Sequence, residues 1–241
     1  MIFDDSEQIN TCKKCEGPAY VLIQKEHSYC KPCFYENVNH KFRSTIGKSK
    51  LVKKGNRILL AVSGGASSSV MLQLTREGLS LENQHRRLQF IPSILHIDES
   101  ALIPADVRTE ITAEIREKLV SHDFDCYFTS IAKSFRESDV QLFTKNHATG
   151  VPADGAEESK LQQTLSALTS SSSKEELVRR LRIQLIVDVA VAEGFDAIFL
   201  GSSGSRLSIQ LITDVAQGKG NQIDLETVSN LIDIRCSFND A

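Results

Sequence analysis

The sequence predicts an α/β fold in which helices cover both faces of a parallel sheet, preceded by a small four-cysteine module. From residue 58 onward, short apolar runs alternate with longer segments of helical periodicity. Gly/Ser-rich turns directly follow two of these runs, and two CxxC pairs precede the first run. A chain of 241 residues has room for one domain of this kind and a small appendage.

The composition predicts a protein of an intracellular compartment without a membrane span. Apolar residues make up 41% and charged residues 24% of the chain, and no apolar run approaches the roughly 18 residues of a spanning helix. The acidic N-terminus lacks the basic start and apolar centre of a secretory signal. Inside the cell, cysteines are metal ligands or free thiols more often than disulfides.

Residues 1–36 are predicted to form a four-cysteine metal-binding module resembling a zinc ribbon. Cys12 and Cys15 form one CxxC pair, and Cys30 and Cys33 form a second pair after fourteen intervening residues. Each pair can place two thiolates about 3–4 Å apart, as tetrahedral zinc requires. We expect structural zinc that supplies folding free energy to a segment too short to bury much apolar surface. An iron–sulfur cluster stays open, because thiolate spacing does not choose the metal.

The other two cysteines have no partner at motif spacing. Cys126 falls in a predicted strand, where a buried and inert thiol is expected, and Cys236 lies near the C-terminus. Neither is predicted to be catalytic.

Residues 37–57 are predicted to be a basic connector. Between residues 11 and 60, eleven Lys/Arg residues stand against three Glu, a net charge of +8 in a chain whose net charge is −3. A basic arm on an acidic body indicates contact with a polyanion, and a merely solvated linker is the alternative. The cations assigned to backbone contact are Lys41, Arg43, Lys48, Lys50, Lys53 and Lys54.

Residues 58–241 are predicted to form the α/β domain, with a polar insertion over 133–173. Apolar runs predict strands at 58–62, 90–97, 125–131 and 197–200. Helical periodicity predicts helices at 69–77, 106–120, 173–194 and 205–216. Gly78 and Gly194 are predicted to end helices, and Ser173 with Glu176 forms a capping-box pattern.

The predicted functional site lies where two Gly/Ser-rich turns leave their strands. One turn covers residues 63–68 after the first strand, and the other covers 201–205 after the fourth. Ligands of parallel sheets bind at the carboxyl ends of the strands, and the N–H groups of such a turn bind anions. Asp98 ends the second strand and is expected at the same edge.

The first turn resembles the SGGxDS loop of the PP-loop ATP pyrophosphatase superfamily, which has an adenine nucleotide α-hydrolase-like fold. Those enzymes adenylate a carbonyl and release pyrophosphate. The acidic position of that loop is Ser67 here, and a hydroxyl does not hold Mg²⁺ as a carboxylate does. The second turn likewise lacks the acid or imidazole typical of active members. The residues assigned to this degenerate nucleotide or phosphate site are Ser63, Gly64, Gly65, Ser67, Ser68 and Asp98, with binding of ATP and Mg²⁺ left open.

Taken together, several segments resemble the cytoplasmic tRNA 2-thiolation protein 2 family, and the likeness runs from about Cys12 to Gly220. These segments are the cysteine quartet, residues 40–43 and 47–48, the SGGxSS loop and the turn at 201–206. The resemblance implies a cytoplasmic, heterodimeric partner of an intact PP-loop homologue, the protein 1 family. Together they place sulfur from the thiocarboxylate of a ubiquitin-like carrier onto C2 of wobble uridine 34 of tRNA, in forming 5-methoxycarbonylmethyl-2-thiouridine.

In this reading the chain belongs to a tRNA sulfurtransferase complex, has no catalytic residue of its own, and contributes tRNA binding. Two alternatives stay open: an active PP-loop adenylating enzyme with altered metal ligands, and a zinc-ribbon adaptor with no part in thiolation. Relatives continue past Ala241 with a further segment, so we expect a shortened product, a fragment or a divergent form.

Overall fold

The structure is a computed structural model that describes residues 11–23, 27–81, 87–103, 108–136, 141–145, 155–218 and 231–233. The chain divides into a smaller unit of residues 1–52 and 74–88 and a larger unit of residues 53–73 and 89–241. Helix α2 (Ala66–Ser80) contributes to both units. Among the described helices, none combines the length and the apolar character needed to cross a membrane.

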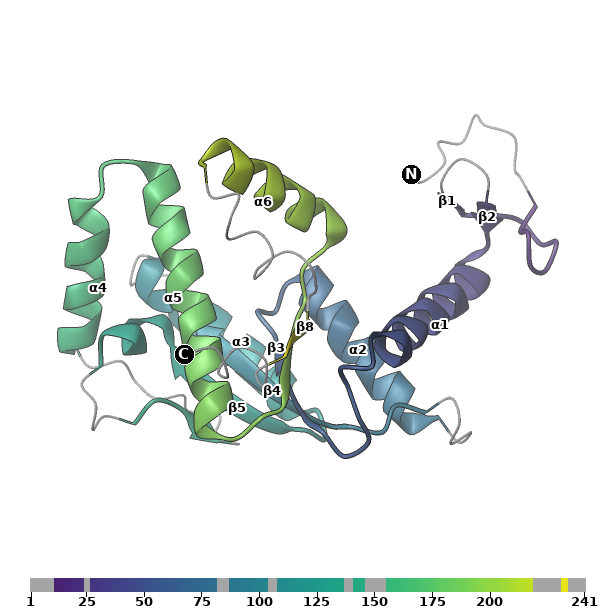
Figure 1. Cartoon of the computed structure of the whole chain (residues 1–241), viewed down its shortest axis with the longest axis horizontal. Helices are drawn as coiled ribbons and strands as arrows, with labels where there is room; N and C mark the ends of the chain where they lie inside the picture. The colour runs from purple at the N-terminus through teal and green to yellow at the C-terminus, as the bar shows by residue number, and fades with distance from the viewer. Residues whose placement is uncertain are drawn as a thin grey trace. The chain divides into compact units, whose positions relative to one another are not determined.

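The smaller unit is a β-hairpin followed by a long helix. Strands β1 (Val21–Ile23) and β2 (His27–Tyr29) pair antiparallel, and α1 (Lys31–Ser49) begins directly after them (Figure 1). Pro32 suits the first turn of α1, where its missing N–H costs no helical hydrogen bond. Most of the predicted basic connector is therefore helical. Tyr35 and Asn39 of α1 both donate hydrogen bonds to the Glu77 carboxylate of α2.

The larger unit contains a six-stranded sheet in the order β6-β5-β4-β3-β7-β8. The four central strands run parallel, and the short edge strands β6 and β8 run antiparallel to their neighbours. The strands are β3 (Arg57–Ala61), β4 (Ile91–Asp98), β5 (Asp125–Ser130), β6 (Thr144–Lys145), β7 (Ala197–Leu200) and β8 (Leu231–Asp233).

Helices cover both faces of this sheet, which confirms the predicted fold class. On one face, Leu59 and Tyr127 belong to a buried cluster with Leu185 and Val189 of α5. On the other face, the Cys126 thiol lies 3.4 Å from the Leu119 carbonyl oxygen of α3. The remaining helical elements are η1 (Ser100–Leu102), α3 (Arg108–Val120), η2 (Ile131–Phe135), α4 (Gly155–Ala167), α5 (Ser171–Ala192) and α6 (Gly204–Ala216).

The predicted polar insertion contains a docked helix, α4. Its Leu161 is fully buried in the same cluster as α5. Its Glu157 forms an ion pair of 2.9 Å with Lys133 of η2, and these side chains are only 7% and 3% exposed. A buried pair of opposite charges thus holds the insertion against the end of β5.

Helix α6 buries an acidic side chain and leaves apolar side chains exposed. Asp214 is buried, accepts a hydrogen bond from Gln210 and lies 3.9 Å from Arg179 of α5. Ile209 and Ile212, in contrast, are 65% and 68% exposed. This is the reverse of the usual amphipathic helix.

Two predicted helix signals are wrong and one is confirmed. Gly78 lies inside α2, where a Cβ would meet the Leu88 side chain at 2.5 Å, so this glycine permits close packing rather than ending the helix. Helix α5 begins at Ser171, and Glu176 binds Arg179 and Arg180 instead of closing a capping box. Gly194 has a φ of +68° just after α5 and confirms the predicted stop.

Candidate functional site

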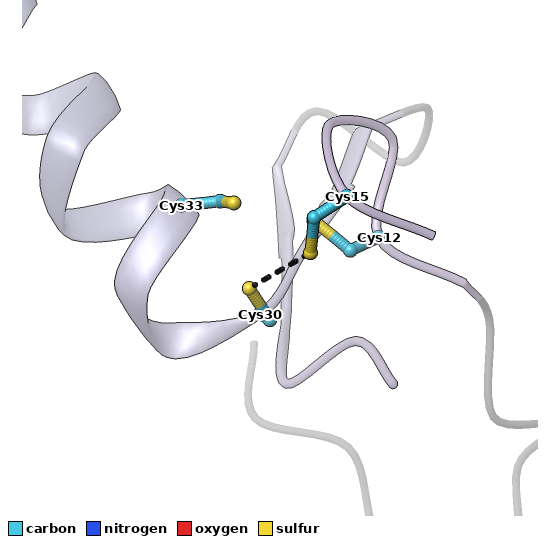
Figure 2. A group of neighbouring side chains, drawn as sticks. All are labelled: Cys12, Cys15, Cys30 and Cys33. Atoms are coloured by element: carbon cyan, nitrogen blue, oxygen red, sulfur yellow. Dashed lines mark hydrogen bonds between the residues drawn. The ribbon is translucent and has the colours of Figure 1, made fainter. Parts of the chain in front are cut away.

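The four predicted metal ligands come from two tight turns of the smaller unit. The Cys12 N–H donates to the Gly17 carbonyl over 2.7 Å, and the Glu16 N–H donates back to the Cys12 carbonyl over 2.9 Å. Cys30 directly precedes α1, and Cys33 lies in its first turn. Figure 2 shows the four side chains directed toward one another, two from the first turn and two from the start of the helix.

The sulfur atoms are close enough to enclose one ion. All four Sγ atoms lie within 4.8 Å of one another, and those of Cys15 and Cys30 are 3.6 Å apart. A tetrahedron with Zn–S bonds near 2.3 Å has edges of about 3.8 Å. The cluster of four cysteines is therefore positioned to bind a metal.

The thiols of this cluster differ in acidity. A backbone hydrogen bond from Cys30 lowers the pKa of Cys12 to about 6, whereas hydrogen bonding to the Cys30 thiol raises the pKa of Cys33 to about 12. Because a metal binds the thiolate, the lowered pKa of Cys12 favours the form of this side chain that can act as a ligand.

In the larger unit, the phosphate loop links β3 to α2, as the sequence predicts. Gly64 has a φ of +83°, which a residue with a Cβ rarely adopts. The Ser68 hydroxyl donates to the Gly65 carbonyl over 2.9 Å and lies 3.4 Å from the Ser63 hydroxyl. These hydroxyls are thus held by bonds within the loop itself.

The second predicted Gly/Ser-rich turn, after β7, contacts this loop. A Cβ on Gly201 would lie 2.5 Å from the Ser68 Cα and 2.9 Å from its backbone nitrogen. Only a glycine permits this approach, so the turn after β7 packs directly against the start of α2.

Asp98 lies at the end of β4, and its carboxylate forms an ion pair with a residue of α3. The Arg116 guanidinium lies 2.6 Å from Asp98, and the Ser100 N–H donates to the same carboxylate over 2.8 Å. The neighbouring Ile115 side chain would lie 3.2 Å from a Cβ at Gly64. Sequence reasoning missed both α3 residues, because no local pattern links this helix to the loop.

His96 is a further residue of this region that the sequence reading missed. Its buried Nδ1 lies 2.9 Å from the Val62 carbonyl oxygen, immediately before the loop. Burial lowers the pKa of His96, which favours the neutral ring. A neutral His96 that donates from Nδ1 supports the backbone at the start of the loop.

The predicted tRNA-contacting cations fall in both units. Lys41 and Lys48 are exposed on α1, and Lys50 follows the helix in a left-handed conformation with a φ of 57°. Arg43 is half-buried, with its Cδ 3.8 Å from a Cβ built on Gly78. Lys53 and Lys54 are exposed at the start of the larger unit. A role in binding RNA stays a prediction for all six.

Comparison with a solved structure adds to the evidence for the fold. A U34-tRNA thiolase, NcsA from Methanococcus maripaludis with its [4Fe-4S] cluster, aligns with a TM-score of 0.61 at 16% identity. The alignment covers 92% of this chain and 65% of the thiolase. At this identity, the likeness establishes a shared fold.

Sequence comparisons identify relatives of one kind. No protein-family model matches the chain. "Cytoplasmic tRNA 2-thiolation protein 2" is 31% identical from Bos taurus over 253 residues, and 30% identical from Danio rerio over 256 residues. The alignments cover 87% and 90% of this chain but 50% and 51% of the relatives, so the chain spans about half their length. Over the greater part of its residues, this chain is therefore homologous to the cytoplasmic tRNA 2-thiolation protein 2 family.

Proposed function

We propose that this chain is a non-catalytic subunit of a cytoplasmic tRNA sulfurtransferase complex, needed for 2-thiolation of wobble uridine 34. The observation that carries the proposal is the degenerate phosphate loop on the fold of a U34-tRNA thiolase. Ser67 stands at the acidic position of the loop, and the Asp98 carboxylate is already bound in an ion pair with Arg116. With these two groups unable to hold Mg²⁺, the charge of a bound triphosphate would not be offset.

In the proposed division of labour, an intact PP-loop homologue adenylates the C2 carbonyl of uridine, and a ubiquitin-like carrier delivers the sulfur. This chain supplies binding surface for the tRNA. Lys41 and Lys48 are separated by two helical turns on α1, so both can face one stretch of phosphate backbone. Each phosphate contact steepens the dependence of binding on salt, by about 0.7–0.9 in log–log slope.

We further propose zinc as the metal of the cysteine quartet. Sulfur atoms within 4.8 Å of one another fit a single tetrahedral ion. In a four-iron cluster each cysteine binds a different iron, so the sulfurs would have to stand farther apart. A closed site of four cysteines has no open coordination position and serves to hold the fold.

The central test deletes the gene that encodes this chain and measures the modification of tRNA. We expect 2-thiouridine at position 34 to be lost on deletion and restored by the wild-type chain, as quantified by mass spectrometry of digested tRNA. Retention of the modification after deletion would support the adaptor without a part in thiolation.

A second measurement separates the subunit from an active enzyme. The purified chain, supplied with ATP, Mg²⁺ and unmodified tRNA, is expected to release no pyrophosphate alone, whereas the co-purified heterodimer does. Pyrophosphate release by the chain alone, abolished by substitution of Gly64 and Gly65, would establish the adenylating enzyme instead.

A further inference from the structure

An exposed tyrosine and a lysine lie together on the surface of the four-cysteine module. The Lys31 ammonium lies 4.2 Å from the centroid of the Tyr20 ring, over its face. Although Lys31 covers one face, Tyr20 is still 42% exposed. The open part of the ring offers a flat, amphipathic surface that can bury area against a partner.

The backbone of the module fixes this pair in place. The Tyr20 N–H donates to the Tyr29 carbonyl over 2.8 Å, which extends the β1–β2 pairing by one residue. Tyr20 is thereby held beside Cys30, the residue that precedes α1, and Lys31 is the first residue of that helix. The relative position of ring and ammonium therefore depends on the hairpin register and on the metal ligand between them.

The same module carries further exposed cations, one of which is offset by a neighbouring acid. Lys13 lies 3.1 Å from the Nδ1 atom of His27, and Lys14 is paired with Glu36. Lys13, Lys14 and Lys31 are all exposed. Aromatic side chains among surface cations are the usual construction of surfaces that bind single-stranded nucleic acid, where bases stack on rings and lysines follow phosphates.

We propose that Tyr20 is a stacking platform for one unpaired nucleobase of an RNA. The base stacks on the ring face opposite Lys31, and the Lys31 ammonium, 4.2 Å from the ring centroid, contacts an adjoining phosphate. The inference rests on the proposed function, since tRNA supplies unpaired bases in its loops and at its 3′ end. It adds a base contact on the metal module, separate from the six cations assigned to the backbone.

The experiment compares variants of the full, metal-loaded chain in binding tRNA and a short single-stranded RNA carrying 2-aminopurine. We expect Tyr20→Leu to weaken binding about tenfold, the equivalent of about 1.4 kcal/mol, with the salt slope unchanged. Tyr20→Phe, which keeps the ring, should bind within twofold of the wild type. Stacking should also quench the 2-aminopurine fluorescence in the wild type and in Tyr20→Phe but not in Tyr20→Leu.

Tyr35 provides the matched control, because it is 43% exposed in the same unit and its hydroxyl is bound to Glu77. Tyr35→Leu should leave the fluorescence quenching intact. Metal content, measured for each variant, separates loss of the ring from loss of the fold. Equal affinity and quenching in Tyr20→Leu and wild type would overturn the platform while leaving the thiolation role standing. A wild-type chain that binds no tRNA, alone or with its partner, would overturn the proposed RNA contact and the platform together.

Discussion

Replacement of Gly201 by alanine tests whether the two turns of the larger unit pack as tightly as the structure indicates. The added Cβ would lie 2.5 Å from the Ser68 Cα, 2.8 Å from its Cβ and 2.9 Å from its nitrogen, against ordinary contacts of 3.4–4 Å. The nearest atoms belong to the backbone of α2, so no flexible side chain can move aside. The turn or the helix must shift by about 1 Å, and overpacking of this kind costs roughly 1–3 kcal/mol.

The expected result is a clear loss of thermal stability. For a protein of this size, 1 kcal/mol lowers the Tm by about 2–4 °C, so Gly201→Ala should unfold roughly 2–12 °C below the wild type. Gly204 begins α6 three residues later, and a Cβ there meets nothing within 4 Å. Gly204→Ala should therefore be neutral or stabilising by up to about 1 kcal/mol. Equal melting temperatures of the two variants, measured by circular dichroism, would refute the steric argument.

Three further predictions follow from the metal cluster, the buried ion pair and the buried histidine. Cys30→Ser should lose bound metal, measured by elemental analysis, and part of the helical signal of α1, measured by circular dichroism. The control Cys126→Ala should keep the metal, and metal retained in both variants would contradict the four-cysteine site. Lys133→Met removes the positive charge that faces the buried Glu157 carboxylate and should cost about 3–5 kcal/mol in urea unfolding, while adding Glu157→Leu should recover most of the loss. No recovery would show that the pair is not the cause. The pKa of His96 lies below its ordinary 6.5 in the folded state, so the unfolded chain binds the proton more readily. The free energy of unfolding should therefore fall as the pH drops below about 6.5. If the free energy of unfolding of His96→Asn depends on pH as strongly as that of the wild type, another group is responsible.

The sequence predicted the four central strands and the two Gly/Ser-rich turns because their signals are local. The strand predicted at 197–200 matches β7, and those at 58–62 and 90–97 differ from β3 and β4 by one residue at each end. Such runs are apolar because both faces of the sheet are covered, and the Gly/Ser-rich turns mark their carboxyl ends. The CxxC spacing likewise predicted a cluster that the fold brings together.

Features that depend on distant residues were not predictable in the same way. The Arg116–Asp98 pair joins residues 18 apart and exists because α3 packs beside the end of β4. The docking of α4 depends on one charge pair and on Leu161 within a polar segment, where composition alone suggests an exposed loop. Gly78 resembles a helix stop, yet its role is set by Leu88 across a loop.

The reversed orientation of α6 has a consequence for how this helix is attached. Its most buried side chain is the carboxylate of Asp214, which accepts a hydrogen bond from Gln210 and lies 3.9 Å from Arg179, while Leu207 on the same face is half-buried. Salt screens an exposed ion pair strongly but a partly buried pair much less. The attachment of α6 through Asp214 is therefore expected to persist as the salt concentration rises, because this carboxylate is closed to solvent in the same way as the central strands of the sheet.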